Sequence, residues 1–399
     1  MGTIEIRTAT EDDWDGLFLV DGRNFGFSYT PDEIARRKPT LDLSRFRLAC
    51  DGAEIVGIAG SYALDITLPG GSTVPTGGVT WVSVAATHRR QGILRRLMAA
   101  VHEDIDARGE PLASLGASEG GIYERFGYGV ASRSRVIRIE TTGVDIRPEY
   151  VPPRGSVRFM DRDRAAVEIP RLWEVHSRLR AGEVSRSAAW HAWALDGWSR
   201  PSDGADPATY LRHPDGYAVY RIAGNWTPGF PAHEVRLLEL VANTPDAHVA
   251  LWHTLLNIDL VKMITGRRVV PLDDPLPYLL NDPRAVRTVA LTDGDWVNVR
   301  DPAIAFGART YPTDDRIVIE SEGRRWAIDG GPAGASCKPA RPKPDLTMTQ
   351  SALGALLLGG IRPSALAAGR RLTARNADVL RRADLFFPTA PEPNCQTHY

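Results

Sequence analysis

Cysteine is scarce in this chain, which has three in 399 residues: Cys50, Cys337 and Cys395. Because they are odd in number and widely separated, they indicate neither a disulfide framework nor a CxxC metal site. The nine histidines show no metal-ligand spacing, and no serine, histidine and aspartate stand out as a catalytic triad. We therefore expect a protein of the reducing cytoplasm that binds no metal.

An excess of charge of one sign is also missing. The chain has 48 lysines and arginines against 49 aspartates and glutamates, a formal net charge of −1. No general electrostatic attraction to nucleic acid or to an anionic membrane is expected. The longest apolar stretch, around residues 353–360, is far shorter than the roughly 20 residues of a membrane-spanning helix. Residues 1–6 lack the basic and then apolar layout of a signal peptide. These absences predict a cytoplasmic protein with no nucleic-acid or membrane partner.

The composition that remains is that of a globular protein. Apolar residues make up 43% of the chain and charged residues 24%, which is ordinary for a protein with a large core. At roughly 150 residues per domain, the length suggests two or three domains. Pro148, Pro152 and Pro153 mark a linker, and the pattern of strands and helices changes again near residue 293. We expect three domains, over residues 1–150, 151–290 and 291–399.

The first domain is predicted to be a compact α/β unit. It begins with a strand and a helix, continues with an antiparallel meander, and then has a strand that runs through a basic turn into an amphipathic helix. A short strand, a short helix and a last strand complete it. The expected strands are residues 4–7, 46–50, 55–68, 78–84, 112–117 and 131–140, and the expected helices are about 11–20, 93–109 and 121–126.

The middle region, residues 234–265, repeats the order strand, helix, strand. The turn between its first strand and its helix, residues 243–246, has neither paired arginines nor a glycine. We therefore expect a degenerate second copy of the first domain that holds no cofactor phosphate. The last region has strands at residues 316–320 and 325–329 and later alanine- and leucine-rich helices, which predicts a separate α+β unit.

Residues 89–94, Arg-Arg-Gln-Gly-Ile-Leu, lie between a strand and a helix. The free backbone N–H groups of the helix start therefore point at one spot, with the helix dipole behind them. Arg89 and Arg90 add charge-assisted hydrogen bonds, and Gly92 lets the backbone come close to a phosphate. This arrangement predicts a pyrophosphate cradle. Taken alone, such a turn is about as often the solvated start of a surface helix.

Neighbouring segments strengthen the interpretation as a cradle. Residues 81–84 form a strand whose backbone could splay to hydrogen-bond an extended pantetheine arm. Residues 118–129, Ser-Glu-Gly-Gly-Ile-Tyr-Glu-Arg-Phe-Gly-Tyr-Gly, place Tyr123 on a helix beside an aromatic and glycine-rich turn. In this order and spacing the chain resembles the GNAT acetyltransferase superfamily, whose acetyl-CoA motif is R/Q-x-x-G-x-G/A.

Arg89 and Gly92 match that motif, while Leu94 replaces its last small residue. The strings HRRQGILRRLM and ASEGGIYERFGYG look very like the enhanced intracellular survival (Eis) family of actinobacterial acetyltransferases. The resemblance covers the whole chain and implies a fold of α/β and α+β parts: tandem GNAT folds, the second degenerate, followed by a sterol carrier protein 2-like domain. It also implies a homohexamer, acetylation of aminoglycosides at several positions, and a C-terminal carboxylate that enters the active site.

Transferred residue by residue, the resemblance implies a set of acetyl-CoA contacts and two catalytic groups. Tyr123 would be the general acid, since the CoA thiolate expelled during acetyl transfer needs a proton. The backbone N–H near Val84 would polarise the thioester carbonyl. The α-carboxylate of Tyr399 would be the general base. The acetyl-CoA contacts would be Val82, Ser83, Val84, Arg89, Arg90, Gln91, Gly92, Ile93, Leu94, Arg95, Ser118 and Glu119.

A base is needed because an amine substrate arrives protonated, and the first domain offers no obvious histidine to accept the proton. His88 and His102 lie on the cradle turn and on the helix after it, where solvated or structural roles are more common. A chain-terminal carboxylate, with an unperturbed pKa of roughly 3.5, is ionised at neutral pH. Without the resemblance, a packed aromatic and a frayed chain end are the ordinary interpretations of Tyr123 and Tyr399.

The substrate is expected to be a polyamine small molecule, held in a wide pocket by aromatic rings and by acidic side chains that attract a polycation. Each candidate ring has packing in the core as its alternative. The candidates are Trp14, Phe25, Phe27, Trp81 and Trp190. A second hypothesis is Nε-acetylation of protein lysines in the same cleft. A third, from another class, is a lipid carrier with a vestigial transferase, and the intact CoA motif speaks against it.

Overall fold

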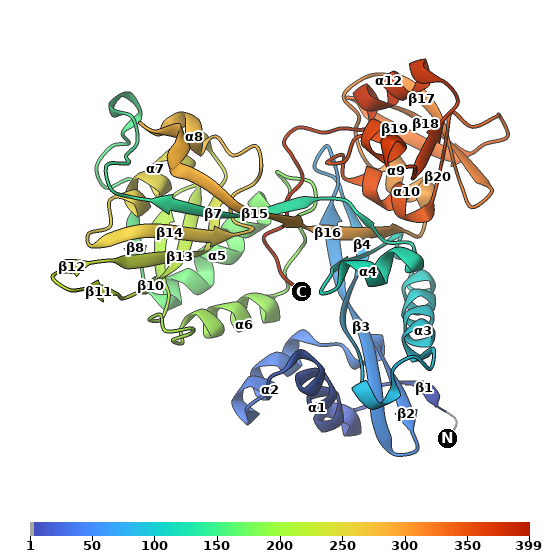
Figure 1. The fold of residues 1–399 in the computed structure, drawn as a ribbon, viewed down its shortest axis with the longest axis horizontal. Helices are drawn as coiled ribbons and strands as arrows, with labels where there is room; N and C mark the ends of the chain where they lie inside the picture. Colours follow the sequence, from blue (N-terminus) through green and yellow to red (C-terminus); the bar gives the residue numbers. More distant parts are fainter. Residues whose placement is uncertain (1–3) are drawn as a thin grey trace. The chain divides into compact units, whose positions relative to one another are not determined.

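The computed structural model describes residues 4–399, which divide into two compact units. Unit 1 comprises the residues up to Ala131, then Asp295–Thr389 and Thr397–Tyr399. Unit 2 comprises Ser132–Gly294 and Ala390–Gln396. The chain therefore leaves unit 1 to form unit 2, returns, and contributes its last ten residues to both. The units contain three main sheets, each with its own helices (Figure 1).

Seven strands form the first sheet of unit 1, in the order β1-β2-β3-β4-β5-β16-β6. Neighbouring strands are antiparallel except β4 and β5, which are parallel and are joined through helix α3. A helix is the usual crossover between parallel strands. The strands are β1 (Glu5–Thr8), β2 (Phe46–Asp51), β3 (Glu54–Thr67), β4 (Thr73–Val84), β5 (Leu112–Gly116), β6 (Gly129–Val130) and β16 (Asp295–Val299).

Two helices cover opposite faces of this sheet, because successive side chains of a strand point to opposite sides. Phe46 and Leu48 of β2 belong to the core that α1 (Trp14–Phe25) covers. Ala49, which follows Leu48 in the strand, belongs instead to the core under α3 (Ile93–Ala107). Short helices α2 (Pro31–Arg37) and α4 (Gly120–Tyr123) complete this part of unit 1.

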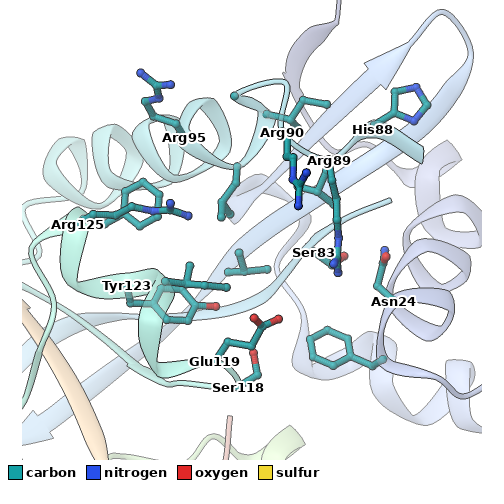
Figure 2. A pocket seen from close by; sticks show the side chains of 18 residues that line it. Asn24, Ser83, His88, Arg89, Arg90, Arg95, Ser118, Glu119, Tyr123 and Arg125 are labelled. Carbon is teal, nitrogen blue, oxygen red and sulfur yellow. The ribbon is translucent and has the colours of Figure 1, made fainter. Parts of the chain in front are cut away.

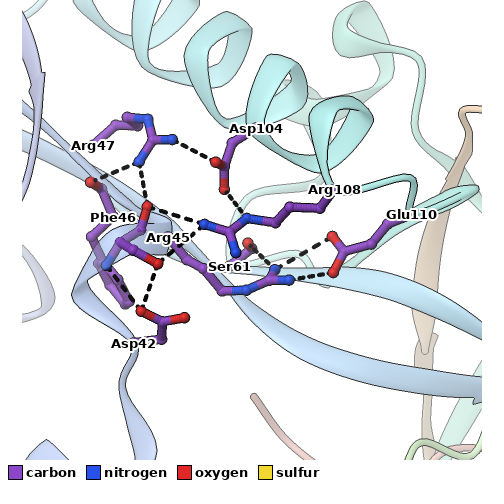
Figure 3. A network of polar contacts seen from close by, with 9 residues as sticks. Asp42, Arg45, Phe46, Arg47, Ser61, Asp104, Arg108 and Glu110 are labelled. Carbon is purple, nitrogen blue, oxygen red and sulfur yellow. Dashed lines mark hydrogen bonds and ion pairs between the residues drawn. The ribbon is translucent and has the colours of Figure 1, made fainter.

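A polar network fixes the C-terminal half of α3 to the sheet (Figure 3). Asp104 on α3 pairs with Arg47 on β2 at 2.7 Å. Beside this pair, Arg45 and Glu110 form an ion pair in which the side chains are only 5% and 7% exposed, and Arg45 also donates to the Ser61 hydroxyl on β3 at 3.0 Å. A buried charge is costly without its partner, so this geometry is strongly specified. The network thereby holds the C-terminal half of α3 against β2.

The second part of unit 1 is a five-stranded sheet in the order β19-β18-β17-β20-β21. Its helix α10 lies directly on β16: a Cβ on Gly354 would stand 1.9 Å from the Val297 carbonyl oxygen, so only glycine allows this approach. The elements are α9 (Pro302–Gly307), β17 (Asp315–Ser321), β18 (Arg324–Gly331), β19 (Gly334–Pro339), β20 (Leu346–Met348), α10 (Gln350–Leu357), α11 (Pro363–Ala368), β21 (Leu372–Ala374) and α12 (Ala377–Phe386).

Unit 2 is built on a seven-stranded sheet in the order β15-β7-β14-β13-β10-β9-β8. Its β13 and β14 are parallel and are joined through α7, as β4 and β5 are joined through α3. The elements are β7 (Arg133–Glu140), β8 (Arg158–Met160), α5 (Arg162–His176), α6 (Ala188–Trp198), β9 (Thr209–His213), β10 (Gly216–Ala223), β11 (Trp226–Thr227), β12 (Phe230–Pro231), β13 (His233–Ala242), α7 (Pro245–Leu256), β14 (Val261–Arg267), α8 (Leu276–Leu279) and β15 (Val286–Asp293).

The expectation that the strand over residues 131–140 completes the first α/β unit is wrong. The strand exists as β7, but it pairs with β14 and β15 in unit 2. In unit 1 the sheet is instead completed by β16, which pairs with both β5 and β6. Alternating apolar residues predict that a segment is a strand, but they do not say which sheet it joins.

Among residues 4–399, no helix combines the length and apolar character needed to cross a membrane. The same residues contain no group of three or more histidine, cysteine, aspartate or glutamate side chains placed to hold a metal ion.

Candidate active site

A cavity of about 690 Å³ opens in unit 1 at the end of β4 and the start of α3, with α4 and the end of α1 beside it (Figure 2). Its volume is within the range of about 300 to 1,000 Å³ that is usual for small-molecule sites. It is lined by Asn24, Phe25, Val82, Ser83, Val84, His88, Arg89, Arg90, Gly92, Ile93, Leu94, Arg95, Ser118, Glu119, Ile122, Tyr123, Arg125 and Phe126.

The cavity lies where β4 and β5 separate. Their parallel pairing ends at Gly78 and Ser114, after which β5 continues to pair with β16 on its other side. Three residues beyond Gly78, Trp81 has a φ of 55° and the register of β4 against β3 shifts. A bulge of this kind bends a strand and increases its twist. The far end of β4 therefore has a free edge toward the β5 side, the geometry in which an extended ligand can add to a strand.

The turn after β4 presents an anion-binding helix start. Gly92, at the N-cap of α3, has a φ of 77°, and no side chain among residues 4–399 caps the helix. Arg90 also has a positive φ, 64°, which is costly for a residue other than glycine and is typical of functional turns. The first N–H groups of a helix have no acceptor within it, and the helix dipole adds positive potential there. This start can bind a phosphate through its backbone.

Polar side chains around the cavity are left without partners in the described part of the chain. Arg89, Arg90 and Arg95 are exposed and form no ion pair there. The hydroxyl of Ser83, a residue only 7% exposed, has no hydrogen-bond partner. Figure 2 shows Arg89 and Arg90 extending over the cavity toward Ser83. Buried polar groups are nearly always hydrogen-bonded, so the unsatisfied Ser83 hydroxyl points to a polar ligand.

Replacing both Arg89 and Arg90 with alanine is expected to weaken acetyl-CoA binding about tenfold to a hundredfold. Two charge-assisted hydrogen bonds are lost, and solvent exposure reduces the contribution of each. Calorimetric titration measures the affinity, and the melting temperature should stay unchanged because both side chains are exposed. The double variant Arg316→Ala/Arg324→Ala, in the distant β17 and β18 hairpin, is the matched control. Unchanged affinity in the Arg89 and Arg90 variant would rule out the cradle.

Tyr123 is the buried phenol of the site. It ends α4, its side chain is 5% exposed, and Figure 2 shows its hydroxyl directed into the cavity near Glu119. Burial raises the pKa of Tyr123 above its usual value, and the Glu119 charge adds to this, while a hydrogen bond with Ser118 opposes it. The phenol is therefore protonated at neutral pH and can act as a proton donor.

The ring of Tyr123 is held by its neighbour Tyr128, whose ring meets it edge-on at 6.1 Å between centroids. Tyr128 is fully buried, and its hydroxyl bonds to His102 Nε2 at 2.9 Å. Burial lowers the pKa of His102 to about 4, so this histidine is neutral and structural. Tyr128 is thus a packing residue, whereas Phe126 lines the cavity.

The cavity brings together almost all of the predicted acetyl-CoA contacts. Eleven of the twelve line it, and the exception, Gln91, is an exposed residue of the same turn. Sequence reasoning missed five further lining residues. Four of them could have been found from their places inside the quoted motifs, but Asn24 comes from the end of α1 and carried no signal. The missed residues are Asn24, His88, Ile122, Arg125 and Phe126.

Among the aromatic candidates for the substrate pocket, Trp14, Phe27 and Trp81 are linked through ring contacts with Phe18 and Tyr29. Phe25 lines the cavity, and Phe27 is 47% exposed and packs on Tyr29. Trp81 is 7% exposed and packs in the core under α1. Trp14 lies on the surface of that core and donates to Glu11 at 2.9 Å. Trp190 is a buried residue of unit 2.

The C-terminal tail is held in both units. In unit 2, the Asn394 N–H donates to the Ala181 carbonyl at 3.0 Å and the Gln396 N–H donates to Glu183 at 2.7 Å. In unit 1, the Tyr399 hydroxyl donates to the Ser114 hydroxyl oxygen at 2.7 Å. A frayed chain end, the ordinary expectation for a last residue, is not what this chain has.

The second copy of the fold differs from the first at the corresponding places. The start of α7 is capped, because the Thr244 side chain accepts a hydrogen bond from the Ala247 N–H. On β13, beyond its last pair with β14 at Leu237 and Gly266, the side-chain amide of Gln396 bonds to both the N–H and the carbonyl of Leu240. The helix start and the strand edge that are free in unit 1 are therefore satisfied by the chain itself in unit 2.

Comparison with known families divides the chain into three matched segments. An acetyltransferase (GNAT) domain matches residues 5–131, a second acetyltransferase (GNAT) domain matches residues 182–300, and a sterol carrier protein domain matches residues 305–396. This order is the predicted one: two GNAT domains, and then a domain similar to sterol carrier protein 2.

Individual proteins are similar over nearly the whole chain. The N-acetyltransferase Eis of Mycobacterium tuberculosis is 33% identical and covers 96% of this chain and 97% of its own. An uncharacterised N-acetyltransferase of Streptomyces avermitilis is 34% identical, with 98% of both chains covered. The structure of Eis1 from Mycobacterium abscessus superposes with a TM-score of 0.87 at 31% identity, over 99% of this chain and 100% of the other. A GCN5-related N-acetyltransferase from Anabaena variabilis has a TM-score of 0.83 at 18% identity, over all of both chains, and shares the fold.

Proposed function

Because the chain belongs to the Eis family of N-acetyltransferases, we propose that it transfers the acetyl group of acetyl-CoA to amines of aminoglycoside antibiotics, at several positions of one molecule. The acetyltransferase activity follows from the family. The donor site and the kind of amine rest on the cavity of unit 1 and on the resemblance of its motifs.

The donor fits the groups that line the cavity. The uncapped start of α3 and the unpaired Arg89 and Arg90 suit a pyrophosphate. The free edge of β4 and the unsatisfied hydroxyl of Ser83 suit the amides of an extended pantetheine arm. The observation that carries the proposal is this coincidence of unsatisfied donors with a buried phenol in one cavity.

The chain's own residues then supply the proton transfers. The α-carboxylate of Tyr399 accepts a proton from the substrate ammonium, which leaves the nitrogen lone pair free to attack the thioester carbon. A backbone N–H near Val84 stabilises the negative charge on the carbonyl oxygen. Attack forms the new carbon–nitrogen bond and leaves one surplus proton on the nitrogen. As the carbon–sulfur bond breaks, Tyr123 donates its proton to the departing sulfur, and the surplus proton of the nitrogen passes through water to the phenolate, which restores Tyr123. The products are the acetamide and free CoA.

Mass spectrometry of an aminoglycoside panel, incubated with the protein and acetyl-CoA, tests this proposal. Acetylated products with one or several acetyl groups are expected, and they should be absent without acetyl-CoA. A lysine-containing peptide set in the same assay tests the alternative substrate. Acetylation of the peptides with all aminoglycosides unmodified would overturn the proposed substrate class and favour protein lysines.

We also propose that the protein assembles as a homohexamer, on the strength of the family resemblance. Multi-angle light scattering is expected to give six times the mass of one chain. A particle of the mass of a single chain would overturn this assembly.

A further inference from the structure

The last residue of the chain is bound by the sheet of unit 1 at the point where β4 and β5 separate. Ser114, which accepts the hydrogen bond of the Tyr399 phenol at 2.7 Å, is the last β5 residue paired with β4. Its side chain is fully buried, and the Thr76 hydroxyl donates to the same oxygen at 3.5 Å. The Tyr399 phenol is therefore bound to a buried residue of the sheet, at the last pair between β4 and β5.

The ring of Tyr399 packs against β4 at Gly78. A Cβ at Gly78, the strand partner of Ser114, would stand 3.2 Å from Cδ2 and Cε2 of the Tyr399 ring and 2.5 Å from Leu64 Cδ1. Only a residue without a side chain leaves this room. Gly78 on β4 thus leaves space for the Tyr399 ring, and Ser114 on β5 accepts the hydrogen bond of its hydroxyl.

From this geometry we propose that Ser114 is a positioning residue, which holds the C-terminal carboxylate for proton abstraction by binding the Tyr399 phenol. The inference rests on the proposed function, in which that carboxylate is the base. A tyrosine has two rotatable side-chain bonds, so fixing its ring and hydroxyl restricts where its α-carbon and carboxylate can lie. A phenylalanine would keep the ring contact with Gly78 and lose the bond to Ser114.

A double-mutant cycle tests the bond without removing the carboxylate. Tyr399→Phe and Ser114→Ala are each expected to lower kcat about threefold to tenfold, since one neutral hydrogen bond is lost. The double variant is expected to match the single variants, because both remove the same bond. The affinity for acetyl-CoA, measured by calorimetric titration, should stay unchanged in all three. Effects on kcat that multiply in the double variant, or single variants with parental kcat, would overturn the role of Ser114.

Tyr311→Phe is the matched control, because it also removes one buried tyrosine hydrogen bond of unit 1, from its hydroxyl to the Phe306 carbonyl at 2.9 Å. It should lower the melting temperature and leave kcat near the parental value. Failure of the inference is distinguishable from failure of the proposed base. If removing Tyr399 abolishes turnover while the cycle shows no coupling, the base stands and the positioning role falls. If removal of Tyr399 leaves turnover intact, both fall.

Discussion

Replacing Tyr123 with phenylalanine is expected to lower kcat by about a hundredfold and to leave acetyl-CoA affinity nearly unchanged. The substitution removes one hydroxyl and keeps the ring, so the packing against Tyr128 persists. What is lost is the proton for the departing sulfur, a contribution of about 10² to 10⁴ in rate for a general acid. Steady-state kinetics with one aminoglycoside and calorimetric titration with acetyl-CoA give the two quantities.

The same phenol sets an expectation for the pH dependence. The protonated form is the active one, and burial raises the pKa of Tyr123. Any loss of kcat through this group should therefore begin above the ordinary tyrosine pKa of about 10. Tyr128→Phe is the matched control: its hydroxyl bonds to His102, so the variant should lose stability by about 1 kcal/mol and keep kcat within a few-fold. A Tyr123→Phe variant with near-parental kcat would remove this residue from the mechanism.

Deleting Tyr399, or extending the chain with a C-terminal tag, is expected to abolish acetylation while acetyl-CoA binding is largely retained. Deletion leaves a carboxylate on His398, but one residue of chain moves it by roughly 3.5 Å, and the bond to Ser114 is lost as well. A tag converts the carboxylate to an amide, which cannot accept the proton. Because the base is needed only to remove the ammonium proton, raising the pH toward the pKa of the amine should partly restore turnover in both variants.

A tag of the same length at the N-terminus is the control for the C-terminal extension. It leaves the terminal carboxylate in place, so turnover should stay at the parental level. Mass spectrometry of products and calorimetric titration report turnover and donor binding separately. A truncated protein that acetylates at the parental rate would place the base elsewhere.

The grouping of the cavity's lining residues was largely predictable from the sequence because most of them lie in short local segments. The turn of residues 89–94 needs a strand before it, a helix after it and glycine at the N-cap, and each of these follows from neighbouring residues. The structure places that turn, Ser118 and Tyr123 around one cavity. That the turn at residues 243–246 lacks a phosphate site was predictable for the same reason. In the structure, the Thr244 side chain caps the helix start there.

What the sequence did not predict depends on contacts between distant segments. Strand β7 looks like the natural end of the first domain, yet its partners β14 and β15 come more than a hundred residues later. That Trp81 packs in the buried core with Leu17 and Phe46 also depends on segments far apart in the sequence. The hydrogen bond of Tyr399 to Ser114 depends on the space left by Gly78. A glycine in a strand does not show from the sequence which side chain occupies the space beside it.

A crystal structure of the protein with coenzyme A tests the central claim most directly. We predict one coenzyme A per chain, with its pyrophosphate on the N–H groups at the start of α3, its pantetheine arm along the free edge of β4, and its sulfur within hydrogen-bond reach of the Tyr123 hydroxyl. Coenzyme A at the start of α7, or with its pyrophosphate away from Gly92, would contradict the account.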